Sequence, residues 1–222
     1  MATITTLRRV ALTGVLALGV AAPSASAATA VDKTAVAAGK LEHTVSRVTV
    51  SGSRAVPSDV RTHVYVSANA SRSLTRDVKS GKLVSETASG PGGSFTWDAE
   101  TDKVRFTKKA TGPAYGSFAT DAANLRAQVA DKALVETGRT VVGTRQALVL
   151  GVGPAYRTSD PGTEDVVVVD AASFALISRT TTAPGGVFVQ KVVVERAETL
   201  ELAGNKKFLK LGKHKAAKRA RG

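Results

Sequence analysis

The chain has 222 residues, with 31 Lys and Arg against 18 Asp and Glu, a formal charge of +13 and no cysteine. The lack of cysteine excludes disulfides, thiol nucleophiles, iron–sulfur clusters, Cys-ligated zinc and attachment of lipid through cysteine. With 43% hydrophobic residues, the chain is long enough for one well-buried core and does not have the composition of a wholly disordered protein.

The positive charge is concentrated at the ends of the chain. Every acid lies between Asp32 and Glu201, and the last eighteen residues hold eight basic residues and no acid. We expect residues 205–222 to form a basic, disordered tail, because such a segment has too little apolar surface to fold by itself. The predicted polyanion-binding residues are those eight: Lys206, Lys207, Lys210, Lys213, Lys215, Lys218, Arg219 and Arg221.

The first residues have the order of a secretory signal peptide. Arg8 and Arg9 precede an apolar run over 10–22, and Ala25 and Ala27 form a small-residue cleavage site. We predict a signal peptide over 1–27, a flexible lead-in over 28–40, and a secreted, cell-surface location. The alternative is an uncleaved membrane anchor, but the apolar run is shorter than the roughly 20 residues that a bilayer requires.

Residues 41–204 are predicted to form a single β-rich domain. Short segments rich in β-branched residues, such as 61–67, 71–78 and 83–87, alternate with turn signals. In the hairpin around 98–102, two aromatic residues share one face of the first strand and two apolar residues share one face of the second. The proposed ligand-lining residues of this hairpin are Phe95, Trp97, Val104 and Phe106.

One helix is predicted over 119–133, where apolar residues recur with helical spacing. Thr120 is the expected N-cap, and Leu125 and Val129 form a narrow apolar stripe that we expect to pack against a sheet and to complete the ligand-lining set.

The second half of the domain is predicted to be β-structure again. Residues 135–142 and 145–152 form a hairpin around Gly143 and Thr144. The continuous apolar run 165–170 is typical of a strand covered on both faces. About nine or ten strands with short connections favour an antiparallel meander.

From about 142 to 200 the order of features resembles the LolA / RseB / LppX type of periplasmic and cell-envelope proteins. The likeness depends on the strand 142–150, on Val168-Val169-Asp170 followed by Phe174, and on Gly185-Gly186 before a final strand; the 98–102 hairpin also fits. The resemblance implies an α+β fold, mostly antiparallel, in which a curved half-barrel sheet carries one or more helices across its concave face. Members bind acyl chains or lipoproteins there, or act as envelope sensors; lipid-binding members are themselves lipoproteins, unlike this chain.

No recognisable catalytic motif is present, so we do not predict an enzyme. A hydrolase with an unrecognised site stays open as an alternative to the two non-catalytic functions described below. The chain contains no G-x-S-x-G, no Ser–Lys signature and no H-E-x-x-H. His43 and His63 lie in different predicted strands and could meet to bind a metal or act as a base, or could be ordinary strand residues. We predict no metal site and no cofactor.

Two functions are compatible with these features. The first is a secreted, non-catalytic envelope protein that binds an acyl chain, lipid or lipoprotein segment in a half-barrel cavity; in that case the aromatic patch is cavity lining rather than core. The second is an interaction module whose tail adheres to anionic cell-wall polymer, anionic lipid or, less favoured, nucleic acid. A tail that only adds solubility is a further alternative. If the tail is disordered, deleting 205–222 leaves the melting temperature unchanged.

Overall fold

The computed structural model describes residues 36–108, 113–154, 162–212 and 214. The predicted signal peptide, most of the lead-in and the end of the basic tail lie outside this part of the chain. Among the described residues, no helix has both the length and the apolar character needed to cross a membrane.

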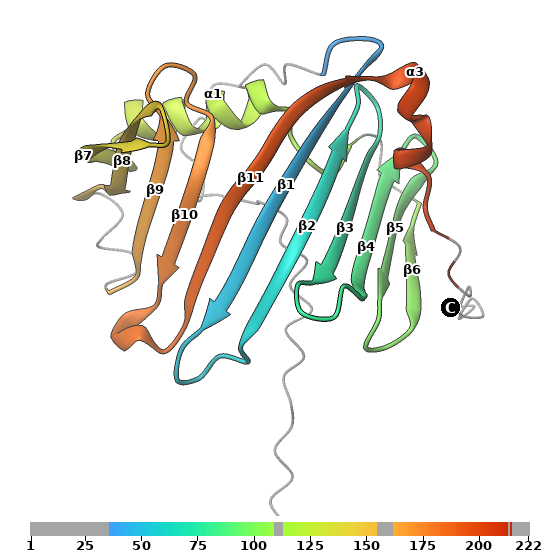
Figure 1. The fold of residues 1–222 in the computed structure, drawn as a ribbon, viewed down its shortest axis with the longest axis horizontal. Helices are drawn as coiled ribbons and strands as arrows, with labels where there is room; N and C mark the ends of the chain where they lie inside the picture. Colours follow the sequence, from blue (N-terminus) through green and yellow to red (C-terminus); the bar gives the residue numbers. More distant parts are fainter. Residues whose placement is uncertain (1–35, 109–112, 155–161, 213, 215–222) are drawn as a thin grey trace, which may run out of the picture.

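Eleven strands form one antiparallel sheet (Figure 1). Their spatial order is β6-β5-β4-β3-β2-β1-β11-β10-β9-β8-β7, so every neighbour pair follows the chain except β1 with β11. The strands are β1 (Lys40–Ser51), β2 (Ser58–Val66), β3 (Ser71–Asp77), β4 (Leu83–Gly90), β5 (Gly93–Asp98), β6 (Lys103–Thr107), β7 (Leu134–Val142), β8 (Arg145–Val152), β9 (Glu164–Asp170), β10 (Leu176–Thr182) and β11 (Val189–Glu201).

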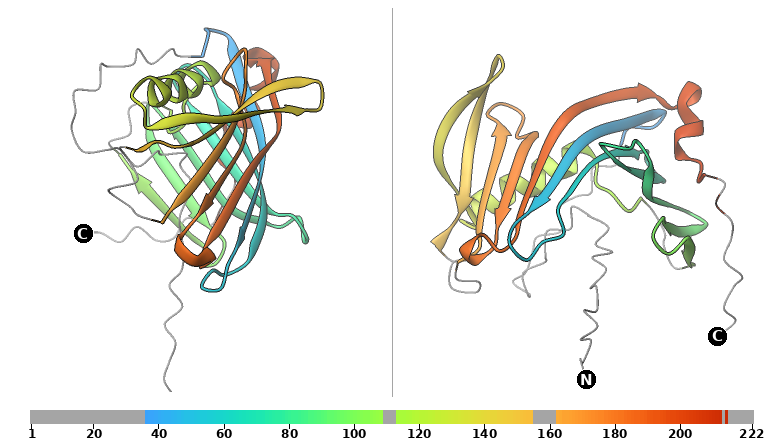
Figure 2. Two further views of the ribbon diagram at one scale, coloured as in Figure 1. Left: turned by 90° about the vertical axis from the view of Figure 1, so that its left-hand side faces the viewer. Right: turned by 60° about the horizontal axis from the view of Figure 1, so that its bottom comes forward.

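The sheet is curved, and helix α1 (Phe118–Ala130) lies on its concave side (Figure 2). Strands β6 and β7 are the two opposite edges of the sheet. The chain between them must therefore cross one whole face, and α1 belongs to that crossing. The predicted curved antiparallel half-barrel, with a helix over its concave face, is confirmed.

Three short helical segments complete the described structure: η1 (Pro184–Gly186), α3 (Leu202–Asn205) and η2 (Lys206–Leu209). The last two follow β11 and lie on the convex side (Figure 1, Figure 2), where α3 contacts β1 and β11 and η2 contacts β2 and β3.

Two details of the sequence prediction are wrong. The helix begins at Phe118 with Ser117 as its N-cap, because the Ser117 hydroxyl accepts a hydrogen bond from the Thr120 N–H. Strand β9 is covered on only one face: Val167 and Val169 are buried, whereas Val166 is 41% exposed. An all-valine run fits an exposed face as well as a buried one, so its composition did not distinguish the two.

Candidate functional site

The concave face is apolar beneath α1. Side chains of β7, β8 and β9 form a buried cluster there, and Leu125 and Val129 of α1 pack against it, together with partly buried apolar residues of the β9–β10 region. The cluster consists of Leu134, Leu148, Leu150, Val167 and Val169. Within α1 itself only Ala122 is fully buried, so the helix lies shallowly on this apolar surface.

The N-terminal end of α1 is held by an acid of the central sheet. Glu42 of β1 accepts a hydrogen bond from the Phe118 N–H (2.7 Å). A carboxylate at this position also suits the positive end of the helix dipole. Burial raises the pKa of Glu42, and the Phe118 N–H partly offsets that rise. Burial, and then the nearby Glu42, raise the pKa of Asp121 to about 6.

The concave face is hydroxyl-rich at the other end of the sheet. The strand registers place only Ser and Thr on this face along the centres of β3, β4 and β5: Ser71, Ser73, Thr75, Ser85, Thr87, Ser89, Ser94 and Thr96. The segment before α1 covers part of this surface. Its Ala114 N–H donates to Ser71 Oγ (2.8 Å), and the Tyr115 hydroxyl bonds Ser73 and Thr87. The concave face is thus amphipathic from end to end.

The predicted ligand-lining residues do not come together in one cavity. Phe95 pairs with Phe106 and Trp97 pairs with Val104, so these four share a face as expected. That face is the convex one, because Trp97 also pairs with Glu86 in the row of residues opposite to Ser71 and Ser73. Leu125 and Val129 lie on the concave side at the other end of the sheet. Period-two alternation groups residues on a face but does not say which face curves inward.

The convex face carries a row of stacked rings. His43 stacks on Tyr65 with ring centroids 4.3 Å apart, and Tyr65 stacks on Phe208 of η2 at 4.9 Å. His63 lies beside His43 with a centroid distance of 5.5 Å. The row therefore runs from the centre of the sheet to the C-terminal segment.

The two histidines lie next to each other, which was one of the two possibilities left open by the sequence, and they belong to one hydrogen-bonded network. His43 Nε2 lies 3.2 Å from His63 Nδ1, and His43 Nδ1 lies 2.8 Å from Glu198 Oε1. Burial, the neighbouring His43 and three arginines lower the pKa of His63. Within the described residues, no group of three or more His, Asp or Glu side chains has an arrangement that could hold a metal ion. The network is an ordinary polar connection between β11, β1 and β2.

Next to the rings, the buried Glu86 holds the C-terminal segment. Its side chain is 1% exposed and accepts hydrogen bonds from Arg72 Nε (2.7 Å), the Gly212 N–H (2.8 Å) and His214 Nε2 (2.6 Å). Burial acts to raise the pKa of Glu86, but Gly212, His214 and Arg72 together lower it below its ordinary value. The carboxylate is thus stabilised in part by residues of the predicted tail.

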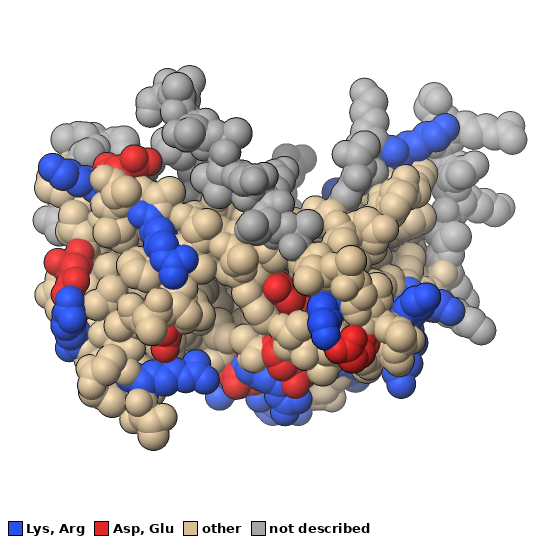
Figure 3. Space-filling view, turned by 90° about the horizontal axis from the view of Figure 1, so that it is seen from above, with Lys and Arg blue, Asp and Glu red and all other residues tan. Residues whose placement is uncertain are grey.

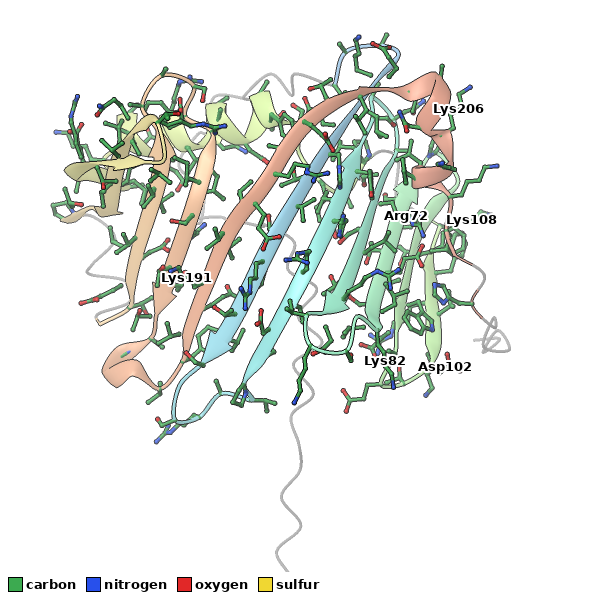
Figure 4. All side chains as sticks on the ribbon, viewed as in Figure 1. Arg72, Lys82, Asp102, Lys108, Lys191 and Lys206 are labelled. Carbon is green, nitrogen blue, oxygen red and sulfur yellow. The ribbon has the colours of Figure 1, made fainter. Side chains whose placement is uncertain are left out.

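Two further contacts fix this segment, which we call the strap and define as Lys206–His214 without residue 213. Arg72 Nη1 donates to the Phe208 carbonyl (3.2 Å), and the His214 ring stacks on Trp97 at 4.2 Å. Figure 4 shows Arg72 on the sheet beside the strap and Lys206 at the start of η2. The predicted disorder of 205–222 is therefore wrong for this part, because Tyr65, Glu86 and Trp97 supply partners that the tail lacks by itself.

The basic residues of the strap face outward. Lys206, Lys207 and Lys210 are exposed, while Phe208, Leu209 and Leu211 are partly buried. Lys215, Lys218, Arg219, Arg221 and Lys213 lie outside the described residues. Seen from above, along the upper edge of the sheet, the surface mixes both signs of charge (Figure 3). Acids and arginines also form bidentate pairs between neighbouring strands, such as Arg47–Asp59 and Arg61–Glu195.

No family model matches this chain, and no curated protein matches it either. Several solved structures are similar to it. MucB from Pseudomonas aeruginosa, in its complex with MucA, aligns at 13% identity and a TM-score of 0.47 over 78% of this chain and 56% of MucB. LprF from Mycobacterium bovis aligns at 12% identity and a TM-score of 0.40 over 71% of this chain and 85% of LprF.

A LolA-superfamily protein from Nitrosomonas europaea aligns at 8% identity and a TM-score of 0.33, over 73% of this chain and 87% of that protein. This chain spans a little over half the length of MucB. The curved antiparallel sheet with a helix on its concave side is the arrangement that the resemblance implied. No family, site or activity is transferred from these distant structures.

Proposed function

We propose that this protein is a secreted, non-catalytic cell-envelope protein that binds an acyl chain, lipid or lipoprotein segment on the concave face of its sheet. The single observation that supports this most is the shallow packing of α1. Leu125 and Val129 pack against an apolar cluster yet remain only partly buried. An apolar ligand between helix and sheet would cover that surface. The predicted division into signal peptide (1–27), lead-in (28–40), domain (41–204) and tail is part of the proposal.

The amphipathic concave face suggests how such a ligand would lie. Its acyl part would contact Leu148, Leu150 and Val167, and its polar part would point toward the hydroxyls of β3–β5. Burial of each CH₂ group contributes about 0.8 kcal/mol, so an acyl chain needs no chemistry to be held. LprF, MucB and LolA-superfamily structures share this architecture, which is in keeping with an extracytoplasmic location.

Replacement of Val129 by Glu tests the concave site. We expect the purified mature protein to contain or take up a fatty-acyl ligand, detected by native mass spectrometry, and Val129→Glu to abolish uptake by placing a carboxylate against the apolar cluster. Ala130→Glu is the matched control, since it adds the same charge at an exposed position of α1. A wild-type protein that is empty and takes up no acyl ligand would contradict the proposal, as would equal uptake by Val129→Glu.

The exposed lysines of the strap favour a second function, adhesion to an anionic cell-wall polymer or membrane surface. Nucleic acid is less favoured, because within the described part of the chain no row of exposed aromatic residues accompanies these lysines. Lys206, Lys207 and Lys210 lie outward, and further basic residues follow along the chain. Each charge near an anionic surface contributes up to about 1 kcal/mol and is screened by salt. A chain ending at Gly204 should lose salt-sensitive binding to cell walls; unchanged binding would contradict this function.

A further inference from the structure

We infer that the strap, docked on the convex face, is a preorganised binding surface for a soluble phosphate polymer, and not a flexible polycation. The inference rests on the adhesion function proposed above and deepens it. Docking turns Phe208 toward Tyr65 and His214 toward Trp97, and it leaves Lys206, Lys207 and Lys210 exposed on the outer side. No acid lies between Leu202 and Gly222 to neutralise them.

The docking contacts involve backbone groups and rings of the strap. Lys207 also takes part in a ring contact, because its Nζ lies 5.3 Å from the centroid of the neighbouring Phe208 ring. Arg72 binds the Phe208 carbonyl, and Glu86 binds the Gly212 N–H and the His214 ring. The three exposed lysines therefore keep fixed backbone positions while their charged ends stay available. Fixing them in advance reduces the ordering cost that a disordered polycation meets when it binds.

A polymer suits this surface better than a bilayer. The apolar residues of the strap, Phe208, Leu209 and Leu211, are partly buried against the protein, so they are not free to insert into a membrane interface. What remains outside is a set of ammonium groups, which act as point charges toward phosphate. A flexible chain of phosphates can follow their spacing, and the chemistry that this surface recognises is the phosphate ester or anhydride anion.

Glu86→Gln separates this inference from simple charge attraction. The variant makes the protein one charge more positive, so attraction alone would strengthen binding to a polyanion. If docking builds the surface, loss of the carboxylate releases the strap and weakens binding by about fivefold or more, a typical size for coupling between two events. Glu100→Gln, in the exposed β5–β6 turn, makes the same charge change away from the strap and should bind no more weakly than wild type.

Glu86→Gln could weaken binding by destabilising the fold, so two further variants release the strap without replacing Glu86. Phe208→Ala removes the stack on Tyr65. His214→Ala removes the stack on Trp97 together with one hydrogen bond to Glu86, whereas both variants leave Arg72 paired with Glu86. Trp97 is the single tryptophan of the chain, so a red-shifted emission spectrum shows directly that the strap has left it. Both variants should show this shift and the weaker binding.

The probe is soluble inorganic polyphosphate, titrated into the full mature chain at constant low salt, with phosphatidylglycerol vesicles in a parallel arm. Equal or tighter polyphosphate binding by Glu86→Gln, Phe208→Ala and His214→Ala would overturn the docked surface. If the chain ending at Gly204 loses binding at the same time, adhesion by a flexible tail stands. If that truncated chain binds as well as wild type, both ideas fail. Binding to vesicles without binding to polyphosphate would overturn the choice of a polymer.

Discussion

At the residue scale, the partners of the buried Glu86 should contribute more to the free energy of unfolding than the partners of an exposed acid do. Arg72 and Glu86 are 12% and 1% exposed at their side chains, whereas the Arg139–Glu136 pair lies at the surface. Removing one member of a buried pair leaves an uncompensated charge, which costs about 3 to 5 kcal/mol, while exposed pairs contribute about 0 to 1 kcal/mol. The two pairs therefore allow a direct comparison within one protein.

We expect Arg72→Ala to lower the free energy of unfolding by about 3 kcal/mol, because Glu86 then keeps only the strap as its partner. Arg139→Ala, the matched surface change, should shift it by less than about 1 kcal/mol. Urea denaturation of both variants at neutral pH checks this. Similar effects of the two substitutions would show that the Arg72–Glu86 pair is not structurally special.

Asp121 gives a pH dependence with a defined sign. Its pKa in the folded protein is about 6, above the ordinary 3.8, so the folded state holds the proton more tightly than the unfolded state. Its contribution to stability is complete below pH 3.8 and is lost as pH rises toward 6. We expect Asp121→Asn to remove this loss, so its stability relative to wild type should rise between about pH 4 and 6 and then level off.

Denaturant unfolding of Asp121→Asn and wild type at a series of pH values measures this difference. The slope should be shallow, because the residue keeps contact with solvent. Asp131→Asn, at the other end of α1, serves as the control at a position away from Glu42. A constant difference between Asp121→Asn and wild type across the pH range would contradict the raised pKa of this carboxyl.

At the element scale, the sequence predicted the strands and the packing of Leu125 and Val129 against the sheet better than it predicted the ends of the helix. The hairpin 135–152 is confirmed almost residue for residue as β7 and β8, because the Gly143-Thr144 turn and the apolar alternation agree. The helix starts two residues before the predicted N-cap, since Ser117 and Thr120 are both capping residues and only tertiary contact with Glu42 decides between them.

The N-cap of α1 can be tested directly. Ser117→Ala should destabilise the protein by about 1 kcal/mol, because the Thr120 N–H loses its acceptor. Ser117→Asn retains a capping oxygen and should recover most of that loss. Thermal unfolding monitored by circular dichroism compares the three proteins, and equal stability of the alanine variant and wild type would contradict the capping role.

At the scale of the whole molecule, the sequence could predict a curved meander but not the docking site for its tail. The partners of the strap come from β2, β3, β4 and β5. No local sequence pattern indicates that Tyr65, Glu86 and Trp97 share one face of the sheet next to the strap. An acid within a run of small β-formers, as at Glu86, is the one signal that could have suggested a buried charge awaiting partners.

Truncation separates the docked part of the tail from the rest. A chain ending at Gly204 should melt about 5 °C or more below wild type, because Glu86 loses two donors and two ring stacks disappear. A chain ending at His214 should have the same melting temperature as wild type. This expectation replaces the unchanged melting temperature predicted for a disordered tail, and differential scanning calorimetry of the two truncated chains decides between them.

The pairing of β1 with β11 has a consequence for how the molecule forms. The two halves, β2–β6 and β7–β10, are built from hairpin neighbours, but the seam between them joins residues as far apart as Lys40 and Glu201, 161 positions along the chain. Closing so long a loop costs entropy before any contact repays it, and such high contact order slows folding. Each half can collapse early, whereas the centre of the sheet forms only when β11 pairs with β1.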